Sequence, residues 1–379
     1  MSACPVPRIA DCFHDLVDPR IERTKRHQLL DVVTIALCAV LAGAESWVEV
    51  AEWGEIKLPW LRTWLKLPNG IPSHDTFGRV FSRLDPEQLE QGLVRWARLL
   101  ATEAAAGADE PTGIVAIDGK TVRAARHPGQ RAPHLVSAWS SANRLVLGQV
   151  AVDDKSNEIT AIPRLLRQLD LTGQTVTIDA MGCQTAIAAQ IVAQGGDYVL
   201  ALKENQPDML RDVIDSFALA DPEHQTTTKE KGHGRLETRT CRTIDDAAVI
   251  AWLNPTGAWP GLRTIAQVVG QRQIGETCVQ HTRYYLSSLP GDAHAIAHAV
   301  RSHWGIENQV HWVLDVAFRE DGSRARVGHA AANLALLRKL VLNLLRADPT
   351  RKVGVKASRL KAGWDDGYLL HVLGVTLAQ

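Results

Sequence analysis

Apolar residues recur at helical spacing along roughly the first hundred residues of the chain. The spacing predicts helices over 29–44, 47–53, 58–67, 76–84 and 86–102, with Ser73 as an N-cap before the fourth. A Pro-Asn-Gly turn falls at 68–70, and an alanine-rich linker is expected at 104–109. The pattern predicts an all-helical N-terminal domain over 1–106. Its 76–84 helix is either the second half of a helix-turn-helix or an ordinary bundle helix.

Beyond this linker, short β-rich runs alternate with helical stretches. Strands are expected at 113–117, 134–140 and 145–152, then a helix at 162–169, a strand at 175–178, a helix at 184–193 and a strand at 198–202. Three strands, helix, strand, helix, strand is the element order of a ribonuclease-H-like α/β domain. Residues 232–289 contain further strand-like runs at 235–243, 263–271 and 277–289 with no obvious helix, and helices return from Ala293.

The predicted fold class is therefore α/β, a ribonuclease-H-like catalytic core with a β-strand insertion, preceded by the helical N-terminal domain. The core is expected over 107–205 and 290–346, the β insertion over 206–289, and a basic C-terminal segment over 347–379.

Composition limits the function in a less direct way. The 379 residues are 45% apolar and 22% charged, as in an ordinary globular protein. The 42 Lys and Arg balance 42 Asp and Glu, which excludes a uniformly basic coat for nucleic acid. The charges are segregated, however: 119–150 contain no acid, and 324–361 contain ten basic residues against Asp348 alone. Each block is either a solvated face or part of a local positive channel for DNA.

Other broad classes are disfavoured. The most apolar window, 29–44, carries Asp31 and is shorter than the roughly 18–20 residues of a membrane span, so a buried helix is expected there. No secretory signal is evident at the N-terminus. The six cysteines are scattered without a CxxC pair, which favours a reduced compartment and gives no zinc site.

Three carboxylates are candidates for chemistry. Asp118 and Asp179 each end a predicted strand and precede a small residue. Glu307 lies in a predicted helix in which Glu307, His311 and Asp315 recur every four residues on one face. Strand-end carboxylates of one sheet can converge at its edge and bind hard divalent cations. A lone strand-end Asp is common, and a solvated helix face is the alternative for Glu307.

Two Asp and one Glu around two Mg²⁺ ions suit phosphoryl transfer. One ion activates water or a 3′-hydroxyl and the other stabilises the leaving oxygen. Nearby basic residues would hold backbone phosphates.

Several collinear motifs then carry a specific resemblance. They resemble the DDE transposases of ISAs-type bacterial insertion sequences, the family that includes the H-repeat-associated proteins. The motifs are AIDGKTVRAAR (116–126), TIDAMGCQTAIA (177–188), YVLALKENQP (198–207), GHGRLETR (232–239), YYLSSL (284–289) and HWGIENQVHWVLDVAFRED (303–321). The N-terminal segments LLDVVTIALCAVLAGAESWVEVAEWG and LPNGIPSHDTFGRVFSRLDPE resemble that family's associated helical domain.

The resemblance implies a DDE transposase that binds terminal inverted repeats and catalyses metal-dependent DNA strand cleavage and strand transfer. Asp118, Asp179 and Glu307 would be the catalytic and metal-binding triad, with two Mg²⁺ ions, for which Mn²⁺ could substitute. The partners would be transposon ends and target DNA, bound by a homodimer in the synaptic complex. A cytoplasmic bacterial protein, nucleoid-associated when bound to DNA and without a membrane role, is expected.

The chain departs from the pattern around its third acid. Related transposases commonly carry Tyr and Arg before the Glu and Lys seven residues after it, where this chain has Val300, His303 and Leu314. Arg301, His303, His311 and Asp315 are the candidate auxiliary residues instead. Candidate DNA-binding residues flank the motifs: Lys120, Arg123, Arg126, Lys203, Gln206, Arg324 and Arg326. Glu204, an extra acid in the 203–206 loop, disfavours a phosphate contact there.

Two alternatives stay open at this stage. One is a domesticated or degenerate copy that binds DNA without transposing it. The other is a ribonuclease-H-like nuclease without strand transfer.

Overall fold

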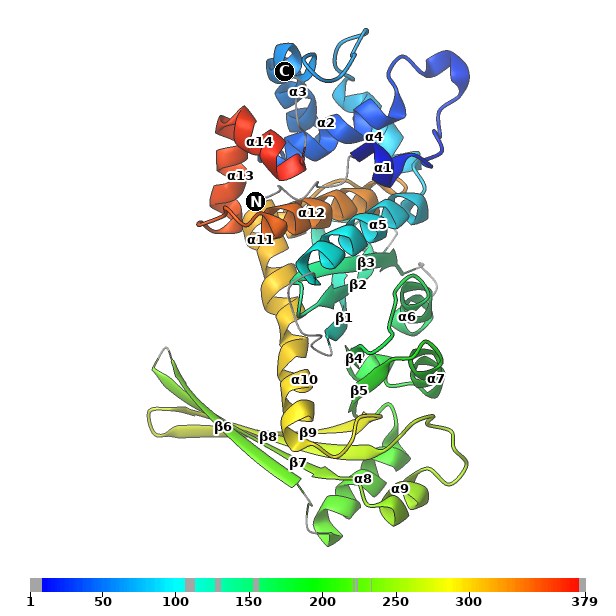
Figure 1. Ribbon diagram of the computed structural model, residues 1–379, viewed down its shortest axis with the longest axis vertical. Helices are drawn as coiled ribbons and strands as arrows, with labels where there is room; N and C mark the ends of the chain where they lie inside the picture. Colours follow the sequence, from blue (N-terminus) through cyan, green and yellow to red (C-terminus); the bar gives the residue numbers. More distant parts are fainter. Residues whose placement is uncertain are drawn as a thin grey trace. The chain divides into compact units, whose positions relative to one another are not determined.

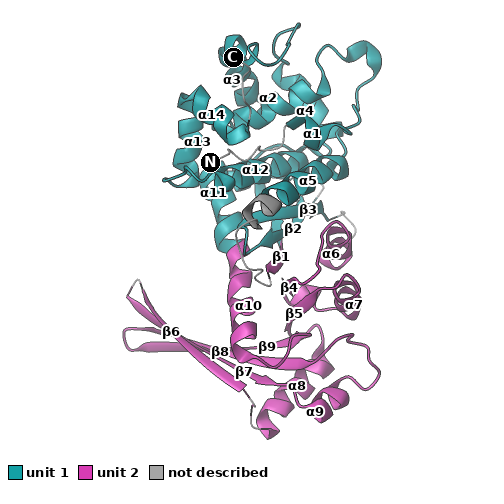
Figure 2. Ribbon diagram, viewed as in Figure 1, with its two compact units in different colours: residues 1–110, 119–156, 307–379 teal, residues 111–118, 157–306 magenta. Residues whose placement is uncertain are grey.

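A computed structural model of the chain describes residues 9–105, 113–126, 131–152, 157–220, 222, 224–232 and 234–374. The chain forms two compact units (Figure 2). Unit 1 comprises residues 1–110, 119–156 and 307–379, and unit 2 comprises residues 111–118 and 157–306. The four segments predicted from the sequence are a different division of the chain and stay a prediction. Residues 106–109 of the expected linker lie outside the described residues.

The N-terminal part of unit 1 is helical, as predicted. Its helices are α1 (Ile9–Phe13), α2 (Leu29–Leu41), α3 (Trp47–Leu61), α4 (His74–Arg83) and α5 (Pro86–Ala105), with a short 3₁₀ turn η1 (Glu22–Thr24). Every residue of α2 except Leu30 is buried, which explains a helix that is apolar on most faces. The prediction of two separate helices at 47–53 and 58–67 is wrong. The structure has one continuous helix there, α3, which includes Pro59 near its end.

Helix α12 (Ala330–Ala347) is the central helix of unit 1, because all its residues from Ala330 to Leu345 are buried. It packs with α2, α4, α5 and the hairpin of β2 (His134–Ser140) and β3 (Leu145–Ala151). The side chain of Asn343 accepts from Val146 N–H and donates to its carbonyl oxygen, at 2.8 Å each. These bonds fix α12 against β3. Other elements of this unit are η2 (Arg123–Ala125), α11 (Trp312–Phe318), η5 (Glu320–Gly322), α13 (Val355–Trp364) and α14 (Asp366–Leu373).

Some cations of the basic block at 324–361 are buried and structural, so this block does not form a continuous basic surface. Arg338, Lys339 and Arg359 are 1%, 0% and 4% exposed. Arg338 donates to the carbonyl of Glu45, and Lys339 donates to the side-chain oxygen of Gln149. Burial lowers the pKa of Lys339 to about 8. A charge count along the sequence could not show that these cations face inward.

Unit 2 is built on a sheet that begins with parallel strands. The residues of β1 (Ile114–Thr121) up to Ile117 pair in parallel with β4 (Thr175–Ile178), and β4 pairs in parallel with β5 (Asp197–Leu202). Helices α6 (Glu158–Leu166) and α7 (Thr185–Ala193) connect these strands, as a parallel sheet requires. The predicted element order is confirmed along the chain, with β2 and β4 at their predicted bounds.

The sheet of unit 2 continues into the insertion through antiparallel pairs. Beyond β5 the strand order is β9 (Thr277–Ser287), β8 (Thr264–Ile274), β7 (Arg235–Ile244) and β6 (His224–Gly232), so β5 pairs with β9. Two helices of this part, α8 (Pro207–Leu219) and α9 (Ala247–Leu253), and strand β6 were not predicted. The expectation of no helix at 232–289 is wrong, because Asp246 caps α9 by accepting from Ala248 and Val249 N–H.

Helix α10 (Ala293–Gly305) begins where helices were expected to return. In Figure 1 it lies against the insertion strands of its own unit. Its Ala293, Ile296 and Ala299 join Cys241 and Tyr285 in a buried cluster. Within the described residues, no helix is both long and apolar enough to span a bilayer.

Replacing Arg359 is expected to destabilise unit 1. Its guanidinium donates to the carbonyl oxygens of Val40, Ala44 and Ala317 and stacks 4.2 Å above the ring of Phe318. Arg359→Met would leave these buried carbonyls without their donor, so the free energy of unfolding should fall by about 3 kcal/mol or more. Denaturant unfolding measures it. Lys356→Met, at an exposed position of the same helix, should change it by less than about 0.5 kcal/mol; equal effects of the two substitutions would contradict this account.

Candidate metal and nucleic-acid site

Asp118 and Asp179 follow equivalent positions of two neighbouring strands. Ile117 of β1 pairs with Ile178 of β4, and the two Asp residues come directly after this pair. Parallel neighbours lie roughly 4.8 Å apart, so the two acids leave the same edge of the sheet side by side. Both are half-buried. This arrangement follows from strand register and needs no specific loop.

The turn after Asp179 is held in place by hydrogen bonds. The Asp179 carboxylate accepts from Met181 N–H at 3.1 Å and so begins the 3₁₀ turn η3 (Ala180–Gly182). The side-chain amide of Asn205 donates to the Ala180 carbonyl at 2.7 Å, and that of Gln206 donates to the Cys183 carbonyl at 3.0 Å. The predicted loop at 203–206 therefore braces this turn. Lys203 and Glu204 in the same loop are exposed.

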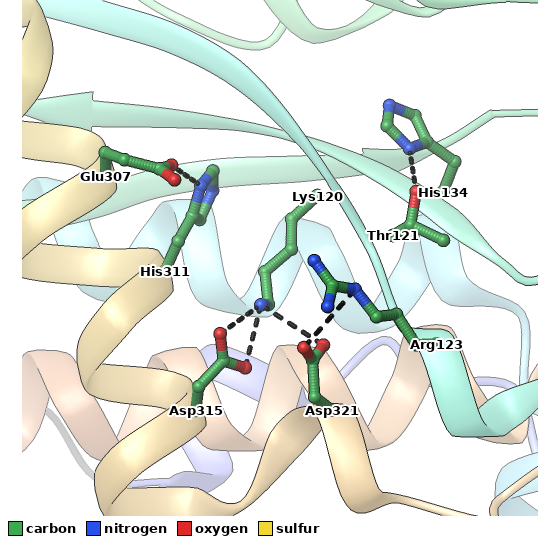
Figure 3. Close-up of polar contacts among 8 residues, drawn as sticks. All are labelled: Lys120, Thr121, Arg123, His134, Glu307, His311, Asp315 and Asp321. Carbon is green, nitrogen blue, oxygen red and sulfur yellow. Dashed lines mark hydrogen bonds and ion pairs between the residues drawn. The ribbon is translucent and has the colours of Figure 1, made fainter.

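Glu307 lies in a π-helical segment, Ile306–His311, between α10 and α11. The Nδ1 atom of His311 is 2.9 Å from the Oε2 atom of Glu307 (Figure 3). The side chain of His311 is 5% exposed and that of Glu307 is 54% exposed. A buried ring thus orients an exposed carboxylate. Single π-helical turns within α-helices often occur at functional sites. The four-residue spacing of Glu307, His311 and Asp315 predicted a helix but could not distinguish a π-helical turn from an α-helix.

Asp118, Glu307 and His311 form a group that could hold a metal ion. One ligand atom from each lies within 4.8 Å of the others. The donor chemistry fits a divalent cation: carboxylate oxygens suit Mg²⁺ and Mn²⁺, and an imidazole nitrogen suits first-row transition metals. Asp179 is not a member of this group.

A second cluster lies just beyond Asp118 in β1 (Figure 3). The Lys120 ammonium is 2.7 Å from both carboxylate oxygens of Asp315 and 3.4 Å from an oxygen of Asp321. Burial opposes the charged form, but the bond to Asp315 and the charges of Glu320, Asp315 and Asp321 outweigh it and raise the pKa of Lys120. Lys120 therefore ties the end of β1 to α11 and η5 rather than standing free on the surface.

The other predicted residues fall in several places. His303 Nδ1 lies 3.0 Å from the hydroxyl of Thr177 in β4, and Arg301 pairs with Glu230 at 3.4 Å. Arg326 donates to the Ala124 carbonyl at 2.9 Å. Five of the six candidate DNA-binding cations are exposed, namely Arg123, Arg126, Lys203, Arg324 and Arg326. Asp321 was not predicted as a site residue, although it is the last residue of the 303–321 motif.

Two acids at equivalent positions of neighbouring parallel strands, together with a Glu on a later helix, define the class of DDE phosphoryl-transfer proteins. Residues 109–344 match the family described as "Transposase DDE domain", and residues 10–97 match the family "DDE_Tnp_1-associated". The chain belongs to the DDE transposase family, with its associated N-terminal domain.

Individual relatives agree with this assignment. The chain is 38% identical to "H repeat-associated putative transposase YhhI" of Escherichia coli (strain K12), over 92% of each chain. It is 39% identical to "Putative transposase YncI" of Escherichia coli O157:H7, over 97% of this chain and 95% of that one. A shorter relative of strain K12, "Inactive transposase YbfQ", is 42% identical over 57 residues. The resemblance found in the sequence is confirmed.

Removing the ammonium of Lys120 should destabilise the fold in a pH-dependent way. Lys120→Met would leave Asp315 and Asp321 without their shared cation, at a cost of about 2 kcal/mol in the free energy of unfolding at pH 7. Because the folded-state pKa is raised, this stabilisation is complete below the unfolded-state value of roughly 10.4 and is lost as pH rises through the folded-state value.

Urea unfolding of both proteins between pH 7 and 11 tests this expectation. The difference between wild type and Lys120→Met should narrow at the alkaline end of the range. Lys352→Met, at an exposed position, serves as the control. A difference that is absent at pH 7, or that grows above pH 10, would be inconsistent with the ion pairs described.

Proposed function

We propose that this chain is the transposase of a bacterial insertion sequence, which binds terminal inverted repeats and catalyses metal-dependent DNA cleavage and strand transfer. The observation that carries the proposal is the pairing of Ile117 with Ile178, which sets Asp118 and Asp179 at one sheet edge inside the segment that matches the DDE domain. Asp118, Asp179 and Glu307 are the proposed catalytic triad.

Each residue of the site has a proposed part in this chemistry. Asp118 and Glu307 would bind divalent cations, with Asp179 completing the set from the neighbouring strand. Mg²⁺, or Mn²⁺ in its place, would supply an activated nucleophile and a stabilised leaving oxygen. His311 orients the Glu307 carboxylate through its 2.9 Å hydrogen bond. Lys120 holds the end of β1 two residues after Asp118.

Exposed cations would bind the substrate around this centre. Arg123 and Arg126 follow β1, and Arg324 and Arg326 follow η5, and all four are exposed. Arginine side chains at such positions suit backbone phosphates, which set register without reading sequence. Joining two transposon ends to a target requires two active sites, so a homodimer in the synaptic complex is part of the proposal.

A second candidate is a DNA-binding copy that no longer transposes. Its support is the similarity to the relative named "Inactive transposase YbfQ". The word "inactive" describes that relative and not this chain. The presence of all three acids in this chain favours activity.

Neutral substitution of the triad should abolish catalysis without abolishing the fold. Asp118→Asn, Asp179→Asn and Glu307→Gln each remove a charge that would bind metal, so Mg²⁺-dependent nicking should fall at least about 100-fold. The substrate is a duplex that carries the inverted repeat flanking the gene. Glu52→Gln, at an exposed position of α3, is the matched control and should nick normally.

The products separate the candidate functions. Recovery of the cut end joined to a target plasmid supports a transposase, whereas cutting without joining supports a nuclease. Wild-type protein that binds the repeat but never cuts it would support the inactive copy. Triad variants that cut as fast as wild type would refute the assignment of these acids.

A further inference from the structure

The four insertion strands form an antiparallel ribbon with two chemically different faces. Because side chains alternate along each strand, the pairing of Thr228 with Arg239, and of Arg239 with Gly270, sets which residues share a face. One face carries Cys241 and Tyr285, which pack against α10. We call it the α10 face, and the other, which carries Lys229, Arg242, Gln271 and Gln280, the outer face.

Acidic residues occur on the α10 face only. Among the residues of β6, β7, β8 and β9, the acids are Glu230 and Glu237, which pair directly with each other in the register. They neutralise the cations around them: Arg239 bonds to both, Arg235 pairs with Glu237 at 2.8 Å, and Arg301 of α10 pairs with Glu230. The α10 face also carries Arg272 and Arg283, so its two acids offset two of the four arginines on these strands.

The outer face has cations and no acid. Lys229 and Lys231 are exposed on β6, and in the described part of the chain neither has a carboxylate partner. Arg242 on β7 is also exposed, and its Nε donates to the side-chain oxygen of Gln225 at 3.0 Å. The positive charge on this face is thus available to an external anion.

The rest of the outer face consists largely of neutral hydrogen-bonding groups joined across the strands. The hydroxyls of Thr227 and Thr240 lie 3.1 Å apart, and the amide of Gln271 donates to Gln280 at 3.0 Å. Its inner end is covered, where Tyr284 packs against Phe217 of α8 at a ring distance of 6.1 Å. An ordered array of amides and hydroxyls with added cations suits a partner rich in anionic and polar oxygen atoms.

The dimensions suit a duplex. Strands β8 and β9 have 11 residues each, which corresponds to roughly 36 Å at 3.3 Å per residue. Four strands at about 4.8 Å spacing give about 14 Å between the outermost strand axes. One turn of B-DNA is about 34–36 Å long, so the face is as long as one helical turn. In Figure 1 the two hairpins of this unit extend beyond α10.

We propose that the outer face of the insertion ribbon docks on the sugar-phosphate backbone of duplex DNA through Lys229, Lys231 and Arg242. This inference rests on the proposed function, because it assigns a further part of the chain to the same substrate. It also gives the insertion a task that the acids of the site do not perform.

Salt-dependent binding of the full chain to a terminal-repeat duplex tests the proposal. Lys229→Gln/Lys231→Gln should lower the slope of log K against log salt by up to about 1.8, since each phosphate contact contributes about 0.9. If the two proteins bind equally at 1 M salt, the variant should bind roughly 60-fold more weakly than wild type at 0.1 M salt. The control, Arg235→Gln/Arg239→Gln, removes the same charge from the α10 face of the same ribbon, where both arginines pair with acids, and should keep the wild-type slope.

Crosslinking gives a second readout at adjacent residues. Gln271 and Arg272 are both exposed on β8 and point to opposite faces. A photoreactive phenylalanine analogue at 271 should crosslink to the duplex, whereas the same group at 272 should not. Circular dichroism checks that each variant is folded.

The outcomes distinguish this inference from the proposed function. Wild-type protein that fails to bind the duplex refutes both. Normal binding by wild type, with equal slopes for the two double variants or equal crosslinking from 271 and 272, refutes the outer face alone. Crosslinks from 271 to a second copy of the chain, without DNA, would assign the face to a protein interface and overturn the proposal.

Discussion

The parallel register between β1 and β4 is the constraint on which the site depends. Ile114 through Ile117 pair with Thr175 through Ile178, and all eight residues are buried. Because side chains alternate along a strand, a slip of one residue would turn Asp118 to the other face of the sheet. Such a slip would also expose the buried apolar side chains of both strands, and its cost in free energy keeps the two acids at one edge of the sheet. Packing of the core thereby determines the position of the chemistry.

Charge in this protein serves two distinct purposes. Some cations are structural: Arg359 satisfies three carbonyls and Lys120 is held by two carboxylates. Others, such as Arg126 and Arg324, are exposed. The balanced total of 42 basic and 42 acidic residues conceals this difference. A local positive surface for DNA is still compatible with zero net charge, but it is smaller than the basic blocks of the sequence indicate.

The sequence predicted the regular elements of the core well, because their signals are local. Strand β4 is a short apolar run that ends in Asp179, and its predicted bounds agree with the structure. Strand β6 was missed because nearly all of its residues are exposed, so it shows no alternation of apolar and polar positions. Helix α9 was missed because seven residues within a β-rich segment give too little helical periodicity.

The remainder of the site depended on tertiary contacts. The Glu307–His311 bond agrees with the predicted four-residue spacing, but the π-helical turn that carries it has no sequence signal. The pairing of Lys120 with Asp315 joins residues 195 positions apart, and no pattern in one sequence reveals such a partner. The two faces of the insertion ribbon also needed the observed strand register, since the sequence alone leaves the pairing open.

The most direct test of the account is the position of a bound metal ion. Anomalous diffraction from crystals soaked in Mn²⁺ would locate it against the side chains. We expect an ion bound directly to carboxylate oxygens of both Asp118 and Asp179, and loss of that peak in Asp118→Asn. An ion bound elsewhere, or one that touches neither acid, would contradict the claim that the β1–β4 register builds a metal-dependent catalytic centre.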